Sequence, residues 1–377
     1  MAGWRRGLSA RLGALLLPLL GLAACAAAAQ PARLVLGQSL PLSGPAFPMA
    51  NRVLAGAKVL VDRINATGGV HGRQIELVTL DDQGDPRRMA DNVRTLVRQH
   101  RALVLLNCLG ERACSAAAEA SRGLGVPLVG AMSGEAALRE RHNRHVFTLR
   151  PDDRREALAL LGQLKAIGVG RVVLLGDGDA PVREQVLVAT LQSGGIDVQR
   201  LRLPAPAALA ASLHDAAAAS AHALVLSLGP ASLDALSRLG PAADEGLPPL
   251  LATLADPGLT QLTRLVRQRA LGFSSVVPNP EASQLPLVRE FERDVDTYGG
   301  PEAISFEGLA GYMAARLSVE ALRRAGAQAE PSSVARAIEG LGSFSLGGFP
   351  LNFSAERHHG SDFVEIGVRS RDGRTRR

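Results

Sequence analysis

The chain has 377 residues, with 42 lysines and arginines against 36 aspartates and glutamates. The formal charge of +6 is too small to indicate a nucleic-acid-binding protein. Aromatic residues make up only 3% of the chain, so any pocket must be lined mainly by aliphatic, small and backbone groups. No two cysteine or histidine pairs have the spacing of a zinc site, so we predict no metal and no cofactor.

The first 29 residues predict a secretory signal peptide, because three arginines precede a short apolar segment at 12–22. Ala27 and Ala29 suit ordinary signal peptidase, whereas Leu22-Ala-Ala-Cys25 resembles a bacterial lipobox in which Cys25 would carry lipid. Both cleavage patterns stay open. Without the leader, 39 basic residues face 36 acidic ones, and no long charge-free apolar run remains. We expect a periplasmic protein, either soluble or anchored by lipid.

From residue 34 on, strand and helix patterns alternate. The apolar run LVLGQSLPL predicts a strand that ends at the turn Ser43-Gly44-Pro45. A helix is expected from about 48 to 66, stopped by Gly68-Gly69, and Asp85 with Pro86 begins another. The other elements predicted in this half are strands at 75–80, 102–106 and 126–129 and a helix at 112–123.

The alternation restarts after residue 151, which predicts a second α/β body. Asp152 or Asp153 caps a helix that continues to about Ile167. The remaining predicted strands are 171–175, 198–203, 223–227 and 250–253, and the remaining helices include 181–192 and 257–268. Apolar strands between helices indicate parallel sheets covered on both faces.

The C-terminal part predicts a return to the first body. A β-rich stretch at 271–277 is followed by helices at 286–298 and 305–325, and a terminal hairpin is expected from 349–353 and 363–368. The predicted fold class is therefore α/β, with two doubly wound parallel-sheet lobes. The first lobe comprises residues 30–147 and 278–341, and the second comprises 148–277 and 342–377.

Polar groups at strand ends are the candidate site, because parallel sheets hold ligands at their carboxyl edges. Ser43-Gly44 and Ser133-Gly134 offer hydroxyl and N–H groups that suit a carboxylate, although ordinary turns use the same residues. Glu111 and Arg112 could face a cleft or begin a solvated helix.

Cys108 and Cys114 could form a local disulfide or be two small buried residues. No nucleophile elbow or phosphate loop is present, so we expect no enzyme.

Several ordered motifs resemble one family. LVLGQSLPLSGP and AGAKVLVDRINATGGVHGRQIELVTLDDQGDP are similar to the first βαβ unit of periplasmic substrate-binding proteins of ABC importers, of the leucine/isoleucine/valine-binding type. GVPLVGAMSG, RHVFTLRP, VVPNP and FEGLAGYMAARLSVEALRRAG extend the resemblance over nearly the whole mature chain. It implies a type I periplasmic-binding-protein fold, with two lobes joined by three crossing strands. These crossings would lie near 145–151, 271–278 and 342–351.

The resemblance also implies where a ligand binds. Family ligand groups come from loops that correspond here to 43–49, 107–112 and 131–134 in the first lobe, and to 177–181, 227–230 and 253–256 in the second. The residues expected to contact ligand are Ser43, Gly44, Phe47, Met49, Gly110, Glu111, Met132, Ser133, Gly134, Asp177, Gly229, Thr253 and Asp256.

The chain departs from its amino-acid-binding relatives at several of these positions. Gly110 and Glu111 replace hydroxyl residues, Met49 stands where an aromatic is expected, and Asp256 is the nearest acid to Thr253. The solute class therefore stays open among amino acids, amides and carboxylates. The resemblance implies a monomeric receptor that delivers a small polar solute to the permease of an ABC importer by closure of its lobes. The alternative is a periplasmic ligand-sensing subunit of a signalling system on the same fold.

Overall fold

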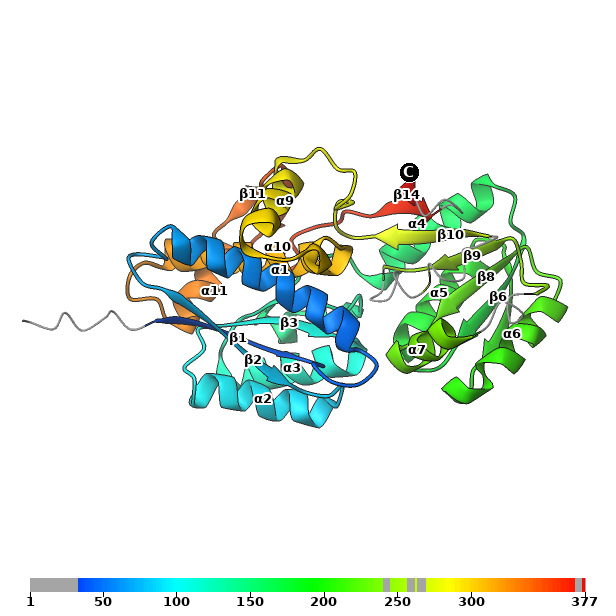
Figure 1. Ribbon diagram of the computed structural model, residues 1–377, viewed down its shortest axis with the longest axis horizontal. Coiled ribbons are helices and arrows are strands. Elements are labelled where there is room, and N and C mark those ends of the chain that lie inside the picture. Colours follow the sequence, from blue (N-terminus) through cyan, green and yellow to red (C-terminus); the bar gives the residue numbers. More distant parts are fainter. Residues whose placement is uncertain (1–32, 240–244, 256–261, 263–268, 370–374, 377) are drawn as a thin grey trace, which may run out of the picture. The chain divides into compact units, whose positions relative to one another are not determined.

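The computed structural model describes residues 33–239, 245–255, 262, 269–369 and 375–376. They form two α/β lobes, each built on one large sheet (Figure 1). We call the lobe with the five-stranded sheet the first lobe and the lobe with the seven-stranded sheet the second lobe. The predicted fold class is confirmed. Among the described residues, no helix combines the length and the apolar character needed to cross a membrane.

The first lobe has a parallel sheet with the strand order β2-β1-β3-β4-β5. Helices α2 and α3 pack on one face and α1 and α10 on the other (Figure 1). Its strands are β1 (Leu34–Leu40), β2 (Ile75–Asp81), β3 (Val104–Leu109), β4 (Leu128–Met132) and β5 (Val146–Phe147). Its helices are α1 (Phe47–Ala66), α2 (Pro86–Arg98), α3 (Glu111–Leu124), α9 (Pro286–Tyr298), α10 (Phe306–Ala325) and α11 (Pro331–Glu339).

The second lobe repeats this strand order. In the sheet β14-β13-β10-β9-β8-β6-β7, the strands from β7 to β10 are parallel, and β13 and β14 add an antiparallel edge. Its strands are β6 (Arg171–Gly176), β7 (Asp197–Arg202), β8 (Ala223–Ser227), β9 (Leu250–Thr253), β10 (Ala270–Ser275), β13 (Glu365–Arg369) and β14 (Thr375–Arg376). Its helices are α4 (Asp153–Ala166), α5 (Pro181–Ser193), α6 (Leu209–Ala218) and α7 (Pro230–Arg238).

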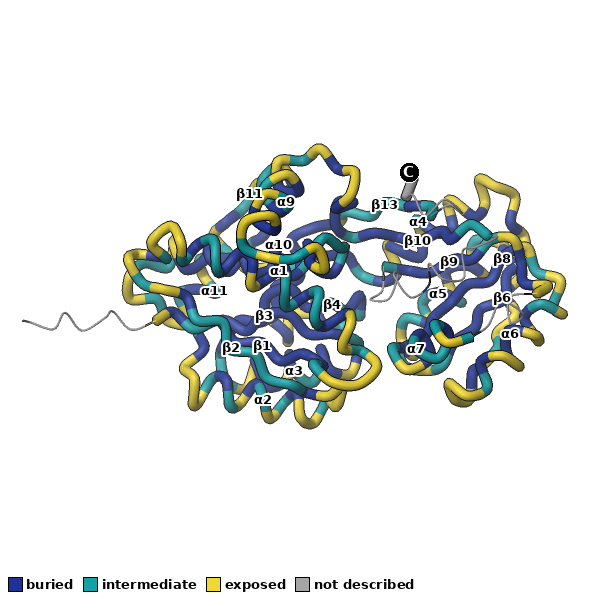
Figure 2. The backbone as a smooth tube through the Cα atoms, viewed as in Figure 1, coloured by how far each residue is buried: buried dark blue, intermediate teal, exposed yellow. Residues whose placement is uncertain are grey.

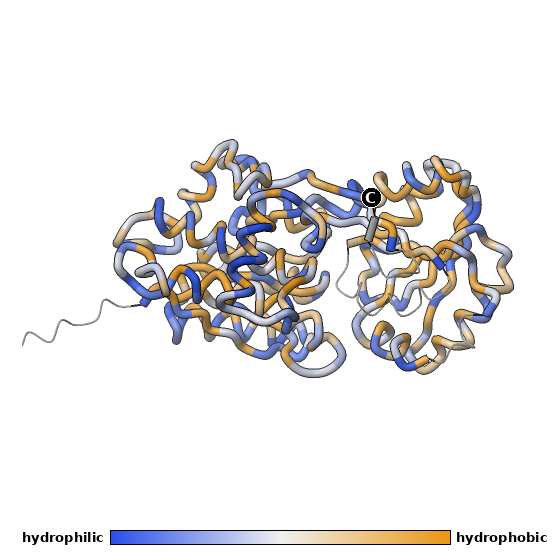
Figure 3. The backbone as a smooth tube through the Cα atoms, turned by 45° about the horizontal axis from the view of Figure 1, so that its top comes forward, coloured by the Kyte–Doolittle hydropathy of each residue, from blue (hydrophilic) through white to orange (hydrophobic). Residues whose placement is uncertain are grey.

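Burial follows this layered arrangement. The central strands β3 and β8 are buried along their whole length, and Figure 2 shows them dark blue between half-exposed helices. Figure 3 shows hydrophobic segments concentrated in the interior of each lobe. The apolar runs in the sequence therefore form the sheets, as predicted. Asp85 caps α2 as expected, because its carboxylate accepts hydrogen bonds from the N–H groups of Arg87 and Arg88.

Helices α1 and α10 approach each other closely through two glycines. A Cβ on Gly56 would lie 1.8 Å from the carbonyl oxygen of Gly308, and one on Gly311 would lie 2.2 Å from that of Val53. Only glycine permits this approach. The contact fixes α10, which comes from late in the chain, against the first helix of the first lobe.

The C-terminal part differs from the prediction. The expected hairpin between 349–353 and 363–368 is wrong, because β12 (Phe349–Phe353) pairs with β11 (Gly342–Leu346) and β13 pairs with β10. Gly347 and Gly348 make the β11–β12 turn with positive φ angles of 62° and 89°. Leu346, Phe349, Leu351 and Phe353 join the core of the first lobe.

The third crossing therefore comes later than residues 342–351. It lies between β12 and β13, where Thr148 of the first crossing and His359 form a parallel bridge. We assign residues 342–353 to the first lobe and propose the other predicted lobe boundaries unchanged. The helix predicted at 257–268 and the signal peptide lie outside the described residues.

Candidate functional site

The carboxyl ends of both sheets contribute to one polar cleft. In each lobe the strand order reverses beside the first strand, and open parallel sheets bind ligands at such a switch point. The cleft holds about 800 Å³ of space between protein atoms, part of it open to solvent. Glu111, Ser133 and Gly134 line it from the first lobe, Asp153 and Arg183 from the second, and Arg150 from the first crossing.

A second cavity adjoins this cleft and is mainly apolar. It holds about 680 Å³ of space and is lined by side chains that include Leu149, Val277, Phe306 and Met313. Met132 and Arg150 line both spaces, so the polar cleft and the apolar pocket are neighbours. A single small molecule could place a polar end in one and an apolar body in the other.

The residues predicted to bind ligand fall into two groups. Those that line the polar cleft are Met49, Gly110, Glu111, Met132, Ser133, Gly134 and Gly229. Those that do not line it are Ser43, Gly44, Phe47, Asp177 and Thr253. Asp256 lies outside the described residues. Loops at strand ends therefore line the cleft, but not every predicted residue in them does so.

In the loop after β1, the Ser43 hydroxyl and the N–H of Leu42 bond to Asp81 and do not point into the cleft. Asp81 accepts hydrogen bonds from the backbone N–H groups of Leu42 and Gln83, and the Ser43 hydroxyl also lies against its carboxylate. Burial alone would raise the pKa of Asp81, but these three hydrogen bonds outweigh it and lower the pKa below its usual value. Ser43 thus stabilises its own loop, while Phe47 is 44% exposed.

The side chains of Asp177 and Thr253 also form hydrogen bonds within their own lobe, the second lobe. The Asp177 carboxylate accepts hydrogen bonds from the N–H groups of Asp179 at 3.0 Å and Gly229 at 2.8 Å. The Thr253 hydroxyl donates to the carbonyl oxygen of Leu226 at 3.1 Å. Both side chains therefore shape second-lobe loops.

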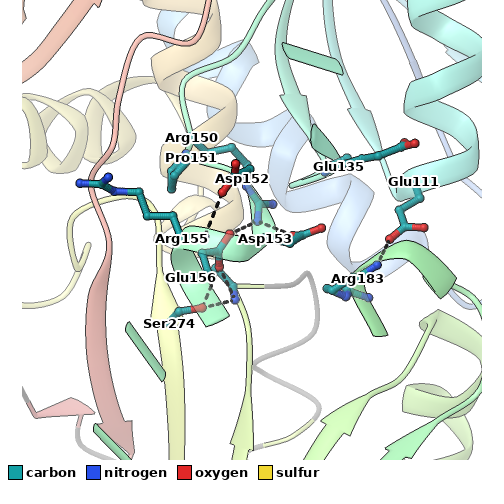
Figure 4. A network of polar contacts seen from close by, with 12 residues as sticks. Glu111, Glu135, Arg150, Pro151, Asp152, Asp153, Arg155, Glu156, Arg183 and Ser274 are labelled. Carbon is teal, nitrogen blue, oxygen red and sulfur yellow. Dashed lines mark hydrogen bonds and ion pairs between the residues drawn. The ribbon is translucent and has the colours of Figure 1, made fainter. Parts of the chain in front are cut away.

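Glu111 makes a direct contact between the lobes. Its carboxylate, at the start of α3, accepts hydrogen bonds from the N–H groups of Arg183 at 2.9 Å and Val182 at 3.3 Å (Figure 4). These N–H groups begin α5, so Glu111 acts as the cap that Ala180 cannot provide. Burial raises the pKa of Glu111, although these hydrogen bonds and the charge of Arg183 oppose the shift. Of the two predicted roles, Glu111 therefore faces the cleft.

Arg112 adds a second link beside the first. Its Nη2 lies 3.2 Å from Oδ1 of Asp179, and both side chains are partly exposed. An exposed pair of this kind contributes little to stability. Its effect here is to neutralise two charges at the mouth of the cleft.

A buried network joins α4 to the first crossing. Glu156, which has no exposed surface, forms an ion pair with Arg150 and accepts a hydrogen bond from the Ser274 hydroxyl at 2.7 Å (Figure 4). It also accepts one from the N–H of Ala255 at 3.0 Å. The carboxylate therefore connects the crossing strand, α4 and the ends of β9 and β10.

A second arginine holds the other side of the same crossing. Arg139 follows β4, and its guanidinium donates to the carbonyl oxygens of Glu135 at 2.7 Å, Arg150 at 3.0 Å and Pro151 at 2.7 Å. Burial, and then the charge of Arg150, lower the pKa of Arg139 to about 10, so it remains protonated at neutral pH. Arg139 thereby connects the loop that follows Ser133 to the first crossing.

Gly134 allows the two lobes to approach at this point. Its carbonyl oxygen accepts a hydrogen bond from the N–H of Asp153 at 2.8 Å, and a Cβ on Gly134 would lie 1.8 Å from Oδ1 of Asp153. Any larger residue would displace the Asp153 carboxylate. The observed position of the Asp153 carboxylate therefore requires glycine at position 134.

The sequence analysis missed the charged residues of this region. Arg150 pairs with Asp153 three positions later and with Glu156 six positions later, so these contacts are local, but no known motif marks them. The sequence RPDD after β5 predicts only a helix cap. Asp152 does cap α4, since its carboxylate accepts a hydrogen bond from the N–H of Arg155 at 2.9 Å.

Cys108 and Cys114 form a disulfide, with their Cα atoms 5.2 Å apart. Both cysteines are fully buried. The sequence left open a disulfide or two small buried residues, and the structure shows a buried disulfide. The bond ties the end of β3 to the first turn of α3. It thereby holds Gly110 and Glu111 at the cleft.

Comparisons with known proteins agree with this architecture. The family model for periplasmic binding proteins matches residues 34–367. A substrate-binding periplasmic protein from Ralstonia solanacearum is 26% identical, with a TM-score of 0.80 over 91% of this chain and 99% of that one. An extracellular ligand-binding receptor from Verminephrobacter eiseniae is 25% identical, with a TM-score of 0.79 over 92% of this chain and 100% of that one.

A third similar structure is a possible leucine/isoleucine/valine-binding protein from Rhodopirellula baltica. It is 24% identical, with a TM-score of 0.80 over 92% of this chain and 96% of that one. No curated protein matches the chain. The resemblance predicted from the sequence is confirmed, and the chain belongs to the periplasmic binding protein family, with the type I fold.

Proposed function

We propose that the protein is an extracytoplasmic receptor that binds a small polar solute between its lobes and delivers it to the permease of an ABC importer. The observation that carries this proposal is the polar cleft, which side chains of both lobes line. A solute that touches both lobes favours the closed state, because it makes all its contacts only there. The solute is released unchanged, so no catalytic step is proposed.

Among the predicted residues, we propose Glu111, Met132, Ser133 and Gly134 as first-lobe contacts of the solute. Gly229 is the proposed contact on the second lobe. The support for this set is that all five line the cleft. Amino acids, amides and carboxylates remain the solute classes to test, and the proposed receptor acts as a monomer without a cofactor.

A thermal-shift screen of these three classes tests the proposal. A true solute at a hundred times its Kd adds about 2.7 kcal/mol to the stability of the folded state and raises the Tm. The Gly134→Ala variant should lose this response, because its Cβ would meet the Asp153 carboxylate. Gly123→Ala is the matched control, since a Cβ there has nothing within 4 Å. If no compound in the three classes raises the Tm, or if Gly134→Ala responds like Gly123→Ala, the proposal fails.

A further inference from the structure

We propose that the amino edge of the first-lobe sheet rests on anionic membrane lipid and is held there by a lipid chain on Cys25. The amino edge is the side of the sheet on which the parallel strands β1 to β5 begin. It lies opposite the carboxyl edge, whose loops line the polar cleft. The inference concerns where the protein is placed and does not depend on the solute that it binds.

Exposed arginines gather along the amino edge. Arg33 stands just before β1, Arg101 lies between α2 and β3, and Arg98, Arg122 and Arg323 occupy the last turns of α2, α3 and α10. We call these residues the basic edge. Because the helix of a βαβ unit runs back to the side where its strands begin, α2 and α3 both end at the amino edge.

Hydrogen bonds bring the end of α10 to the same place. Nε2 of His71 lies 2.9 Å from the carbonyl oxygen of Arg323, and the Arg73 guanidinium donates to that of Ala327 at 3.1 Å. Both side chains come from the turn that leads into β2. Arg73 also donates to the carbonyl oxygen of Arg33 at 3.2 Å. The arginines from both helical layers therefore surround the point where β1 begins.

The charge of the basic edge is largely uncompensated. Arg33 lies 3.6 Å from Glu76, and for the other members of the basic edge no ion pair is found in the described part of the chain. All its members are exposed, and the Arg33 side chain keeps 64% of its accessible surface. The basic edge thus presents a cluster of positive charge to solvent, which attracts an anionic surface.

The helix dipoles explain only part of this cluster. A cation in the last turn of a helix offsets a negative charge of about half an electron at the helix end. Arg98, Arg122 and Arg323 each bring a whole charge, so a positive surplus remains at each of these helix ends. Arg33 and Arg101 belong to no helix. The dipoles therefore do not account for the charge of the whole edge.

The sequence before β1 connects this edge to a lipid anchor. Leu22-Ala-Ala-Cys25 resembles a lipobox, and Cys25 stands eight positions before Arg33. Even a fully extended chain of this length spans at most about 29 Å, at 3.6 Å per residue. The residues between them, AAAAQPA, carry no charge and so do not compete for the lipid surface. A lipid on Cys25 therefore keeps the basic edge, rather than any other side of the lobe, close to the membrane.

The two signals strengthen each other. Stable anchoring takes either two lipid chains or one chain combined with a basic patch. Each arginine near an anionic surface strengthens binding about fivefold, and salt weakens this attraction. On such a surface the loops at the carboxyl edge point away from the membrane. The polar cleft thus stays open to solute, and the electrostatic contact is weak enough to be released.

The lipid anchor is tested on the full chain, expressed in a bacterium with its own leader. Mass spectrometry of the mature protein from the membrane fraction should show a diacylglyceryl group on Cys25. Cys25→Ser removes the sulfur that carries the lipid and should move the protein to the soluble fraction.

The basic edge is tested separately on the mature chain without lipid, beginning at Ala26. It should sediment with vesicles of equal parts phosphatidylcholine and phosphatidylglycerol, and bind them at least about tenfold more tightly than vesicles of phosphatidylcholine alone. High salt should abolish this difference.

Two triple variants remove the same charge from different places. Arg98→Gln, Arg101→Gln and Arg122→Gln together should weaken binding to the anionic vesicles by at least about tenfold. The control combines Arg154→Gln, Arg200→Gln and Arg202→Gln, which are exposed in the second lobe, and should change binding by less than about threefold.

One single variant keeps the test independent of helix stability. Because Arg101 lies outside any helix, Arg101→Gln should leave the Tm unchanged and still weaken binding to the anionic vesicles about fivefold. The inference is overturned if Cys25 carries no lipid or if both kinds of vesicle bind equally. Equal effects of the two triple variants would also refute it, because binding would then follow net charge and not the basic edge.

Discussion

Replacing Glu156 with alanine should lower the free energy of unfolding by about 3–5 kcal/mol, the cost of breaking a buried ion pair. Glu156 has no exposed surface and accepts bonds from Arg150, Ser274 and the N–H of Ala255. Its loss removes the closer ion pair of Arg150 and the carboxylate that accepts hydrogen bonds from Ser274 and Ala255. Urea denaturation followed by circular dichroism measures the change.

Two further variants separate the charge from the hydrogen bonds. Ser274→Ala removes one donor to Glu156 and one of the two acceptors of the Ala255 N–H, and should cost about 1 kcal/mol. Glu119→Ala, on the exposed side of α3, is the control for loss of a glutamate and should change stability by less than about 0.5 kcal/mol. A loss of less than about 1 kcal/mol in Glu156→Ala would show that the network does not stabilise the crossing.

Replacing Arg139 with methionine should cost about 3 kcal/mol, because four carbonyl oxygens lose hydrogen bonds from a charged donor. Those carbonyls belong to Ser133, Glu135, Arg150 and Pro151. The variant should also weaken solute binding, because the hydrogen bonds that join the loop at Ser133 to the first crossing are lost. Urea denaturation measures the first effect, and titration with the solute found by the screen measures the second.

Arg141→Met is the matched control, because Arg141 is an exposed neighbour on the same loop. It should leave both stability and affinity almost unchanged. Arg139→Lys keeps the charge but has fewer donors in a different geometry, so its loss should be intermediate. Equal stability of Arg139→Met and Arg141→Met would refute the role assigned to Arg139.

The sequence predicted the layered architecture because its signals are local. Apolar runs such as that of β8, the glycine stop at Gly68-Gly69 and the cap at Asp85 each depend on neighbouring residues. The alternation of strands and helices then constrained the topology. The same local rule applies to Ser133 and Gly134, which follow directly after β4 and line the polar cleft.

Contacts between distant residues were not predictable in this way. Glu156 and Ser274 are 118 positions apart, and Glu111 bonds to the start of α5 over 72 positions. Their pairing depends on how the lobes fold and meet. The C-terminal error has a similar cause, since β12 was paired with the wrong partner although Gly347-Gly348 marked its turn with β11.

Small-angle scattering of the mature chain with and without its solute tests the central claim most directly. A solute held by both lobes should lower the radius of gyration, and Gly134→Ala, which crowds the contact between the lobes, should not compact. An unchanged scattering profile at a solute concentration that saturates binding by calorimetry would contradict the account.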